Sequence, residues 1–207
     1  MKLCSNHAQC ASAKCEAVSA RDDRGGRLPP GQVQTTKLPI LHLGDVPEFN
    51  PKTWRLRIKG EIAKPIELTF DQLLELPRTL SVSDFHCVTS WSRFDNQWEG
   101  LLVRDLIEIA HLSPQVKFVS FEAEGGYHTS LPLEVAKEDN VILAWRLDGA
   151  DLDPAHGWPL RLVVPKKYAY KSAKWVRVVR FLDSDSPGYW EQRGYSNNAD
   201  PWKEERL

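Results

Sequence analysis

The stretch Ser81–Gly100, SVSDFHCVTSWSRFDNQWEG, contains Cys87, the one cysteine that lies beyond the first fifteen residues. The stretch continues an apparent strand, Thr79–Phe85, and then loses its regular period, which indicates a loop that leaves a strand. Protein scaffolds present metal ligands and nucleophiles at such positions. The alternative is a structural role, because free cysteine is among the residue types most often buried in protein cores.

The two chemical roles of Cys87 make different demands on its neighbours. A nucleophile needs a histidine base, and the adjacent His86 would point to the opposite side of an extended segment. A metal ligand needs only deprotonation, which a highly charged metal enforces. One thiolate supplies too few donors for a bare metal ion, so a ligand role for Cys87 predicts an organic cofactor that supplies the others.

A second group of residues is basic. The segment Ala155–Trp175, AHGWPLRLVVPKKYAYKSAKW, carries one arginine and four lysines in a chain whose formal net charge is -1. Arginine offers a planar fork to a phosphate, lysine a mobile point charge and Ser172 a hydroxyl group. Composition leaves open a site for a phosphorylated ligand, a nucleic-acid contact and a solvated basic loop. Taken together with Cys87, the first of these predicts a single phosphate-bearing organic cofactor.

Length and composition favour one domain. The chain has 207 residues, of which 42% are hydrophobic and 27% charged, and this suffices for one sizeable core. Residues 1–36 show no period and are expected to form a flexible tail before a domain over residues 37–207. A Thr69-x-x-Gln72 capping box predicts a short helix, and spacing of apolar residues predicts another over Val103–Ala110. Strands are predicted at Trp54–Lys59, Val116–Ala123, Tyr127–Leu131, Val141–Leu147, Pro159–Pro165 and Trp175–Asp183.

These elements form no repeating βα unit, which indicates an α+β domain with a mixed or antiparallel β-sheet and short helices. No apolar run approaches the roughly 18 residues of a membrane helix. The start, MKLCSNHAQC, lacks an apolar signal core, so we expect a cytoplasmic protein without a membrane span. A zinc site in the tail is an alternative to a solvated tail, which we prefer because no paired C-x-x-C occurs among Cys4, His7, Cys10 and Cys15.

Three motifs occur in order: FHCVTSWS followed by WEG, then HGWPLRLVVPKKYAYKSAKW, then YWEQRGY. Together they resemble the molybdopterin-binding domain of the sulfite oxidase family, and in particular its short bacterial and archaeal members. The resemblance covers approximately residues 37–207. It implies the α+β fold of that family, a molybdenum-molybdopterin cofactor and a two-electron oxygen-atom transfer that uses a small-molecule substrate and an external electron carrier.

The resemblance also implies roles for individual residues. Cys87 matches the thiolate ligand of molybdenum, and Tyr195 matches the active-site tyrosine. Tyr127 and Arg93 are weaker candidates for the same pocket. The residues expected to bind the pterin and its phosphate are His42, His156, Arg161, Lys171, Ser172 and Lys174.

The chain departs from true sulfite oxidases where they bind sulfite. Leu41 occupies the position of their substrate-binding arginine, and the arginines that follow their ligand cysteine are missing, with Ser92 and Arg93 nearest. A pocket short of two guanidinium groups binds a small anion poorly. Two alternatives to sulfite-oxidase-like oxygen transfer follow. One is an S-oxide or N-oxide reductase, because the C-V-x-x-W-S sequence is closer to bacterial protein-methionine-sulfoxide reductases. The other is a non-redox domain that binds a phosphorylated ligand or RNA, although no nucleic-acid partner is expected.

Overall fold

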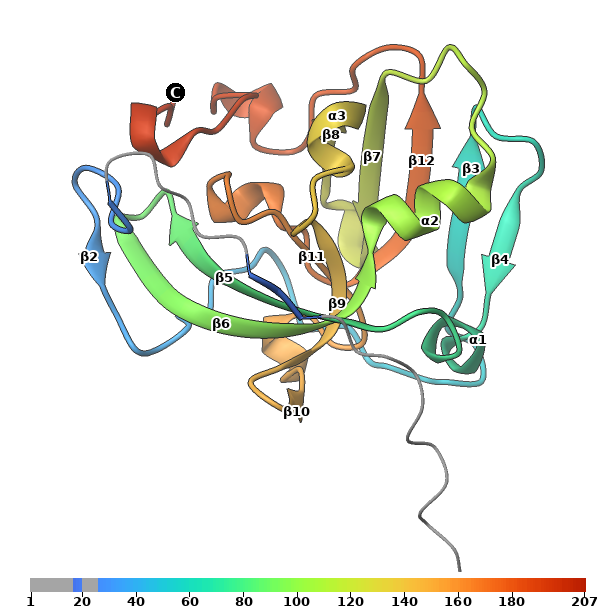
Figure 1. Cartoon of the computed structure of the whole chain (residues 1–207), viewed down its shortest axis with the longest axis horizontal. Coiled ribbons are helices and arrows are strands. Elements are labelled where there is room, and N and C mark those ends of the chain that lie inside the picture. Colours follow the sequence, from blue (N-terminus) through green and yellow to red (C-terminus); the bar gives the residue numbers. More distant parts are fainter. Residues whose placement is uncertain (1–16, 20–25) are drawn as a thin grey trace, which may run out of the picture.

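The computed structural model describes residues 17–19 and 26–207 of the chain, and two β-sheets form its framework (Figure 1). In the described residues, one sheet has seven strands: the path β1-β5-β6-β9-β10, with β11 paired to β9 and β2 to β6. The bounds of these strands are β1 (Ala17–Ser19), β2 (Val33–Gln34), β5 (Thr79–Cys87), β6 (Trp91–Leu102), β9 (Ile142–Leu147), β10 (Ala150–Asp151) and β11 (Arg161–Val163).

The second sheet has five strands in the order β4-β3-β12-β7-β8. Its strands are β3 (Leu56–Gly60), β4 (Ile66–Leu68), β7 (Phe118–Ala123), β8 (His128–Pro132) and β12 (Val176–Leu182). The β1–β5, β2–β6 and β3–β12 pairs are parallel, whereas the central β5–β6, β6–β9 and β7–β12 pairs are antiparallel. These mixed sheets with few short helices confirm the predicted α+β fold class.

Short helices connect the strands. The α-helices are α1 (Phe70–Leu74), α2 (Val103–Ala110) and α3 (Leu133–Ala136), and the 3-10 helices are η1 (Glu124–Gly126), η2 (Pro154–His156), η3 (Ala169–Lys171), η4 (Glu191–Arg193) and η5 (Pro201–Lys203). The predicted capping box is present before α1, because Thr69 Oγ1 accepts a bond from Gln72 N at 3.2 Å and Gln72 Oε1 accepts one from Thr69 N at 2.9 Å.

The main core lies between the two sheets, with α2 packed into it. Helix α2 buries the residues of its predicted apolar face, Val103, Leu106, Ile107 and Ala110. They meet residues of β3, β7, β9 and β12 in one continuous apolar cluster. This packing fixes the two sheets against each other, so the ends of their strands present side chains to a common site.

The prediction of an irregular loop around Cys87 is wrong. Strands β5 and β6 form a long, curved antiparallel hairpin (Figure 1), and Cys87 is the last residue of β5, paired with Trp91. The period was hidden because several polar side chains of the hairpin face the protein interior instead of solvent. Less than 4% of the surface of each is exposed: Ser81, Ser83, Ser92 and Asn96.

The prediction of a flexible tail over residues 1–36 is corrected for residues 26–36. Strand β2 pairs with β6, and Arg27 forms an ion pair with Asp84. Residues 17–19 form β1 beside β5. The zinc-site alternative concerns residues that lie outside the described part of the chain. Among the described residues, no helix is long and apolar enough to span a membrane.

Candidate cofactor site

A cavity of about 590 Å³ opens between the β5–β6 hairpin and the segments that follow β11 and β12. One side is formed by residues 38–45, which contain no helix or strand. The lining also includes residues from the last part of the chain, Tyr189, Trp190 and Tyr195. A volume of this size accommodates a cofactor-sized organic molecule.

Cys87 lines this cavity with 6% of its surface exposed. Its Sγ lies 3.1 Å from Thr89 Oγ1. Burial raises the pKa of the Cys87 thiol, and hydrogen bonding from Thr89 only partly offsets this effect. A bound metal ion would replace the proton, which is how a buried thiol becomes a thiolate ligand. His86 is not among the cavity residues, because its Nδ1 lies 2.7 Å from Ser92 Oγ on the other face of the sheet.

Arg161 brings a buried positive charge to the cavity, with 4% of its surface exposed. Its Nη1 donates to His156 O at 2.8 Å, and its guanidinium lies 5.2 Å from the ring centres of both Phe85 and Trp98. Its buried Nε has no hydrogen-bond partner among the described residues. Burial lowers the pKa of Arg161 to about 10. Such a group is stabilised by an anion that enters the cavity.

Lys174 adds a second cation beside Arg161. Its Nζ donates to Ala155 O at 2.8 Å, and burial followed by repulsion from Arg161 lowers its pKa to about 7. Gly157 permits this close approach, because a Cβ there would lie 2.9 Å from Arg161 Cβ and 3.1 Å from Lys174 Cγ. Two adjoining cations without a carboxylate partner in the described residues suit a multiply charged anion such as a phosphate.

Three other predicted residues line the same cavity. His156 is oriented by a contact of 2.9 Å between its Nε2 and Leu38 O. Ser172 is buried, and its Oγ accepts a bond from Val164 N at 3.0 Å. His42 is exposed and packs edge-on against Trp175, with 5.4 Å between the ring centres. The structure therefore brings together predicted residues that are more than a hundred positions apart.

Two predicted tyrosines also face the cavity. The hydroxyl of Tyr127 donates to the backbone oxygen of Tyr170. Burial raises the pKa of Tyr127 well above its usual value, and the nearby Glu191 raises it further. The ring centre of Tyr195 lies 5.4 Å from that of Tyr170 and 4.9 Å from that of Trp190. Sequence reasoning missed the aromatic character of this wall, although the dense aromatic residues of YWEQRGY indicated it.

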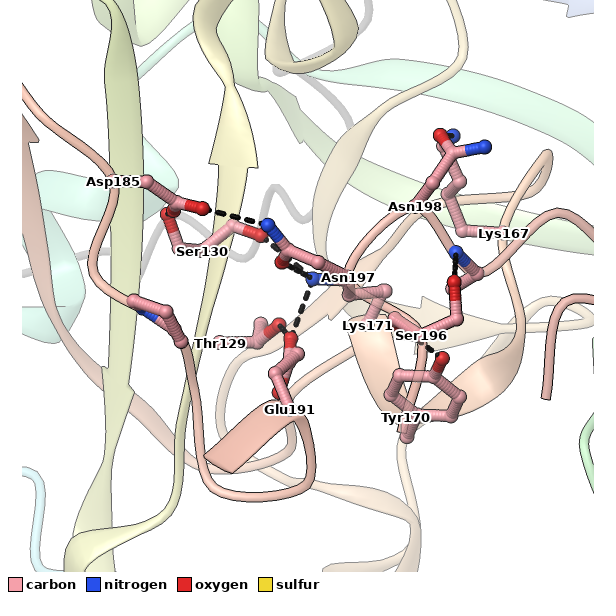
Figure 2. A network of polar contacts seen from close by, with 12 residues as sticks. Thr129, Ser130, Lys167, Tyr170, Lys171, Asp185, Glu191, Ser196, Asn197 and Asn198 are labelled. Carbon is pink, nitrogen blue, oxygen red and sulfur yellow. Dashed lines mark hydrogen bonds and ion pairs between the residues drawn. The ribbon is translucent and has the colours of Figure 1, made fainter. Parts of the chain in front are cut away.

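Lys171 does not line the cavity, in contrast to the prediction. Its Nζ forms a buried ion pair with Glu191 and donates to Ser130 O and Asn197 Oδ1, each at 3.0 Å (Figure 2). Lys171 was predicted to bind the cofactor because it lies within the basic segment, and its partner carboxylate, 20 positions away, was not apparent from the sequence. Lys171 is therefore a structural cation.

Arg93 is likewise turned away from the cavity. It forms an ion pair with Asp148 and donates from Nε to Thr36 O at 3.2 Å. The remaining lysines of the basic segment also have partners, because Lys166 pairs with Glu138 at 3.2 Å and Lys167 donates to Asn198 at 2.6 Å. The segment therefore offers no row of unpaired lysines for a nucleic-acid backbone.

The chain matches the family described as oxidoreductase molybdopterin binding domain over residues 43–190. The uncharacterized oxidoreductase YuiH of Bacillus subtilis is 42% identical over 188 residues, which are 90% of this chain and 95% of that protein. The protein-methionine-sulfoxide reductase catalytic subunit MsrP of Campylobacter jejuni is 30% identical over 175 residues, which are 74% of this chain and 59% of that protein.

Solved structures include the sulfane dehydrogenase SoxCD from Paracoccus pantotrophus, which matches with a TM-score of 0.62 and 27% identity over 67% of this chain and 40% of that one. The cavity described above fits the group that this family binds. It holds a buried thiol, and it holds the unpaired guanidinium nitrogen of Arg161 beside Lys174 for a phosphate. The chain is therefore an oxidoreductase of the molybdopterin-binding domain family, and its cofactor is molybdenum-molybdopterin.

Proposed function

We propose that this enzyme transfers an oxygen atom, in a two-electron reaction, between water and a small neutral substrate that contains sulfur or nitrogen. The observation that carries the proposal is the neutral aromatic wall of the cavity. Among the described residues, the lining contributed by the turn after Cys87, by η3 and by the last part of the chain includes these uncharged residues: Val88, Thr89, Trp91, Tyr170, Tyr189, Trp190 and Tyr195. The carboxylates of the lining are Asp45 and Glu124, and its arginine and lysine are Arg161 and Lys174.

The protein's own residues divide into three roles in this proposal. Cys87 is the thiolate ligand of molybdenum. The pterin and its phosphate would be held by other residues of the lining, and the residues proposed for this are His42, His156, Arg161, Ser172 and Lys174. When bound, the cofactor supplies two-electron oxidation and reduction together with oxygen exchange with water.

Tyr195 is the proposed proton donor and acceptor at the substrate oxygen. It lies in the aromatic wall, and a phenol can donate to an oxygen and take the proton back. Tyr127 is less suited to this role. Its hydroxyl proton is already donated to Tyr170 O, and its raised pKa keeps it protonated.

The wall favours an S-oxide or N-oxide over sulfite. Sulfite is an anion and needs cationic donors near the metal. Arg161 and Lys174 are the arginine and lysine residues that line the described cavity, and the phosphate of the cofactor would occupy both. Leu41 and Leu43 at the rim add apolar surface. The relative MsrP of Campylobacter jejuni is named a protein-methionine-sulfoxide reductase, which agrees with this choice.

The reaction also requires an external electron carrier. Reduction of one sulfoxide consumes two electrons and two protons and releases one water molecule, so the electrons must be supplied from outside the reacting pair. We propose that a separate redox protein supplies them. The relative MsrP is named a catalytic subunit, which is consistent with a division between catalysis and electron supply.

A substrate screen tests this proposal. The full-length chain is produced in a host that makes molybdopterin, and its molybdenum content is measured first. Methyl p-tolyl sulfoxide and trimethylamine N-oxide are then assayed with reduced benzyl viologen, and sulfite with ferricyanide. We expect kcat/KM for the better oxide to exceed that for sulfite by at least about a hundredfold, the scale of a lost charge-assisted contact. Efficient sulfite oxidation with no oxide reduction would contradict the proposal.

A further inference from the structure

The turn that follows Cys87 is held on one side by Gln32. The Gln32 side chain has 7% of its surface exposed, and its Nε2 donates to Cys87 O at 3.0 Å. Its Oε1 accepts a bond from Ser92 Oγ at 3.2 Å. Because the Ser92 proton is used in this bond, His86 Nδ1 donates to Ser92 Oγ across 2.7 Å. A continuous polar chain therefore runs from His86 to the carbonyl of Cys87.

Arg206 holds the same turn from the other side. Its Nη1 donates to Val88 O and, at 3.1 Å, to Ser90 Oγ. Its guanidinium lies 5.6 Å from the ring centre of Tyr168. Figure 1 shows that the last part of the chain lies above the β5–β6 hairpin. Cys87 is thus enclosed between a segment that precedes the main core in sequence and one that follows it.

The backbone of the turn needs such support. Ser90 has a φ of 69°, in the left-handed region that residues other than glycine seldom occupy. Its N–H donates to Cys87 O at 3.0 Å, and its own carbonyl accepts a bond from Val33 N at 3.0 Å. Conformations of this kind persist where the surroundings determine them. Here the surroundings include bonds from Val33 and Arg206, which lie outside the hairpin.

We propose that Gln32 and Arg206 are positioning residues that set the direction in which the Cys87 sulfur points into the cavity. The proposal rests on the metal-ligand role proposed for Cys87. A single protein thiolate is the direct link between the protein and the metal, so restraints on its backbone set the geometry of that link. Residues in the second layer around a metal orient its ligands in this way.

Alkylation of Cys87 in the full-length chain, produced without molybdenum, tests the restraint independently of catalysis. Iodoacetamide labelling is followed by mass spectrometry of the Cys87 peptide. We expect Gln32→Met and Arg206→Met each to raise the labelling rate per thiolate about fivefold, the scale of one lost hydrogen bond. The thiolate fraction is measured separately, because Arg206 also lowers the pKa of Cys87. Arg206→Lys, which keeps a donor, should stay within about twofold of the parent on the same scale. Equal rates in the parent and both methionine variants would overturn the proposal.

Two matched controls remove the same groups elsewhere. Arg55 donates from Nη1 to Lys52 O and Trp54 O, and Gln115 donates from Nε2 to Glu61. Neither residue lines the cavity. Arg55→Met and Gln115→Met should therefore leave Cys87 labelling at the parent rate. If they raise it as much as the test variants do, the effect is general loosening and the proposal fails.

Hydrogen exchange of the unmodified chain tests the proposal even where a variant does not fold. A restrained turn predicts that amides of residues 86–92 exchange at least about tenfold more slowly than amides of residues 40–44, because local opening sets the exchange rate. Comparable rates would contradict it. In the loaded enzyme, the Mo(V) electron paramagnetic resonance g-values should shift in Gln32→Met and Arg206→Met and not in the controls. Unchanged g-values in both test variants would also overturn the proposal.

Failure of the metal-ligand role is distinguishable from failure of the restraint. A Mo(V) electron paramagnetic resonance spectrum in Cys87→Ser that is identical to the parent spectrum would remove the ligand role and the functional meaning of the turn. The labelling and exchange rates of the metal-free chain would still decide whether Gln32 and Arg206 hold it.

Discussion

The ammonium of Lys171 and the carboxylate of Glu191 form an ion pair inside the protein, with 1% and 2% of the two side chains exposed. Glu191 begins η4, and its Oε1 also accepts a bond from Thr129 at 2.9 Å. The pair therefore ties the segment that carries the aromatic wall to β8 and η3 (Figure 2). Burial lowers the pKa of Lys171, and Glu191 acts against this effect.

Removal of the carboxylate from this pair should strongly destabilise the fold. Glu191→Gln leaves the Lys171 ammonium buried without its counter-charge, and breaking such a pair costs about 3–5 kcal/mol. Urea unfolding measures the change in the free energy of unfolding. Glu67→Gln is the control, because Glu67 pairs with Arg57 at 3.0 Å and both side chains are more than half exposed. That change should cost less than about 1 kcal/mol. Equal costs for the two variants would show that burial of the pair is unimportant.

Tyr195→Phe should lower kcat with little change in KM, because the lost hydroxyl acts on a proton and not on binding. General acid catalysis typically contributes about a hundredfold or more. Tyr127→Phe serves as the comparison, because its hydroxyl is bonded to Tyr170 O. It should cost about 1 kcal/mol of stability through the lost bond and change kcat less than Tyr195→Phe does. Steady-state assays with the best oxide substrate measure both; a larger kcat loss in Tyr127→Phe would reverse the assignment.

Cys87→Ser should lose turnover but keep the pterin, whereas Lys174→Met should lose pterin. The first removes the metal ligand and leaves the phosphate site intact, so pterin is retained while turnover is lost. The second removes a cation from the phosphate site, so pterin occupancy falls. Molybdenum is measured by elemental analysis and pterin by fluorescence after oxidative release. Pterin loss in Cys87→Ser together with full activity in Lys174→Met would contradict this division of roles.

Cofactor affinity should fall as the pH rises above 7. The pKa of Lys174 in the cofactor-free chain is about 7. Above that pH the Lys174 amine must take up a proton when a phosphate that requires the ammonium binds. The apparent dissociation constant then rises by up to about tenfold per pH unit. Lys174→Arg remains charged throughout and should lose this dependence. Anaerobic binding of molybdopterin to the full-length chain between pH 6.5 and 9 measures both; identical profiles would exclude Lys174 as the titrating group.

The lowered pKa of Lys174 also determines how its contribution to the free energy of unfolding changes with pH. An unfolded lysine titrates near pH 10.4, so between pH 7 and that value the unfolded chain holds more protons than the folded one. The contribution of Lys174 to the free energy of unfolding of the cofactor-free chain therefore rises with pH across this window. Lys174→Met should have a flatter profile than the parent when both are unfolded in urea at several pH values. A parent profile no steeper than that of Lys174→Met would contradict the lowered pKa.

Local patterns predicted the local structure, and long-range contacts decided the rest. Helix α2 was predictable because its buried residues follow a helical period, and the α1 cap because both partners lie within four residues. Gln32 was not predictable, because its partner Cys87 lies 55 positions away. Lys171 was misassigned for the same reason, since sequence proximity to Lys174 gave no sign of the distant Glu191. Buried serines concealed the hairpin.

The walls of the cavity come from distant parts of the sequence, which include residues 38–45, the β5–β6 turn, η2, η3 and the region around Trp190. A cofactor bound between these segments would link them, because each segment would contact the same ligand. Binding to the folded state alone shifts the unfolding equilibrium by mass action. Proteases that degrade transiently opened chains act on the cofactor-free form first. We therefore expect the supply of molybdopterin to govern how long each copy of this enzyme survives after synthesis.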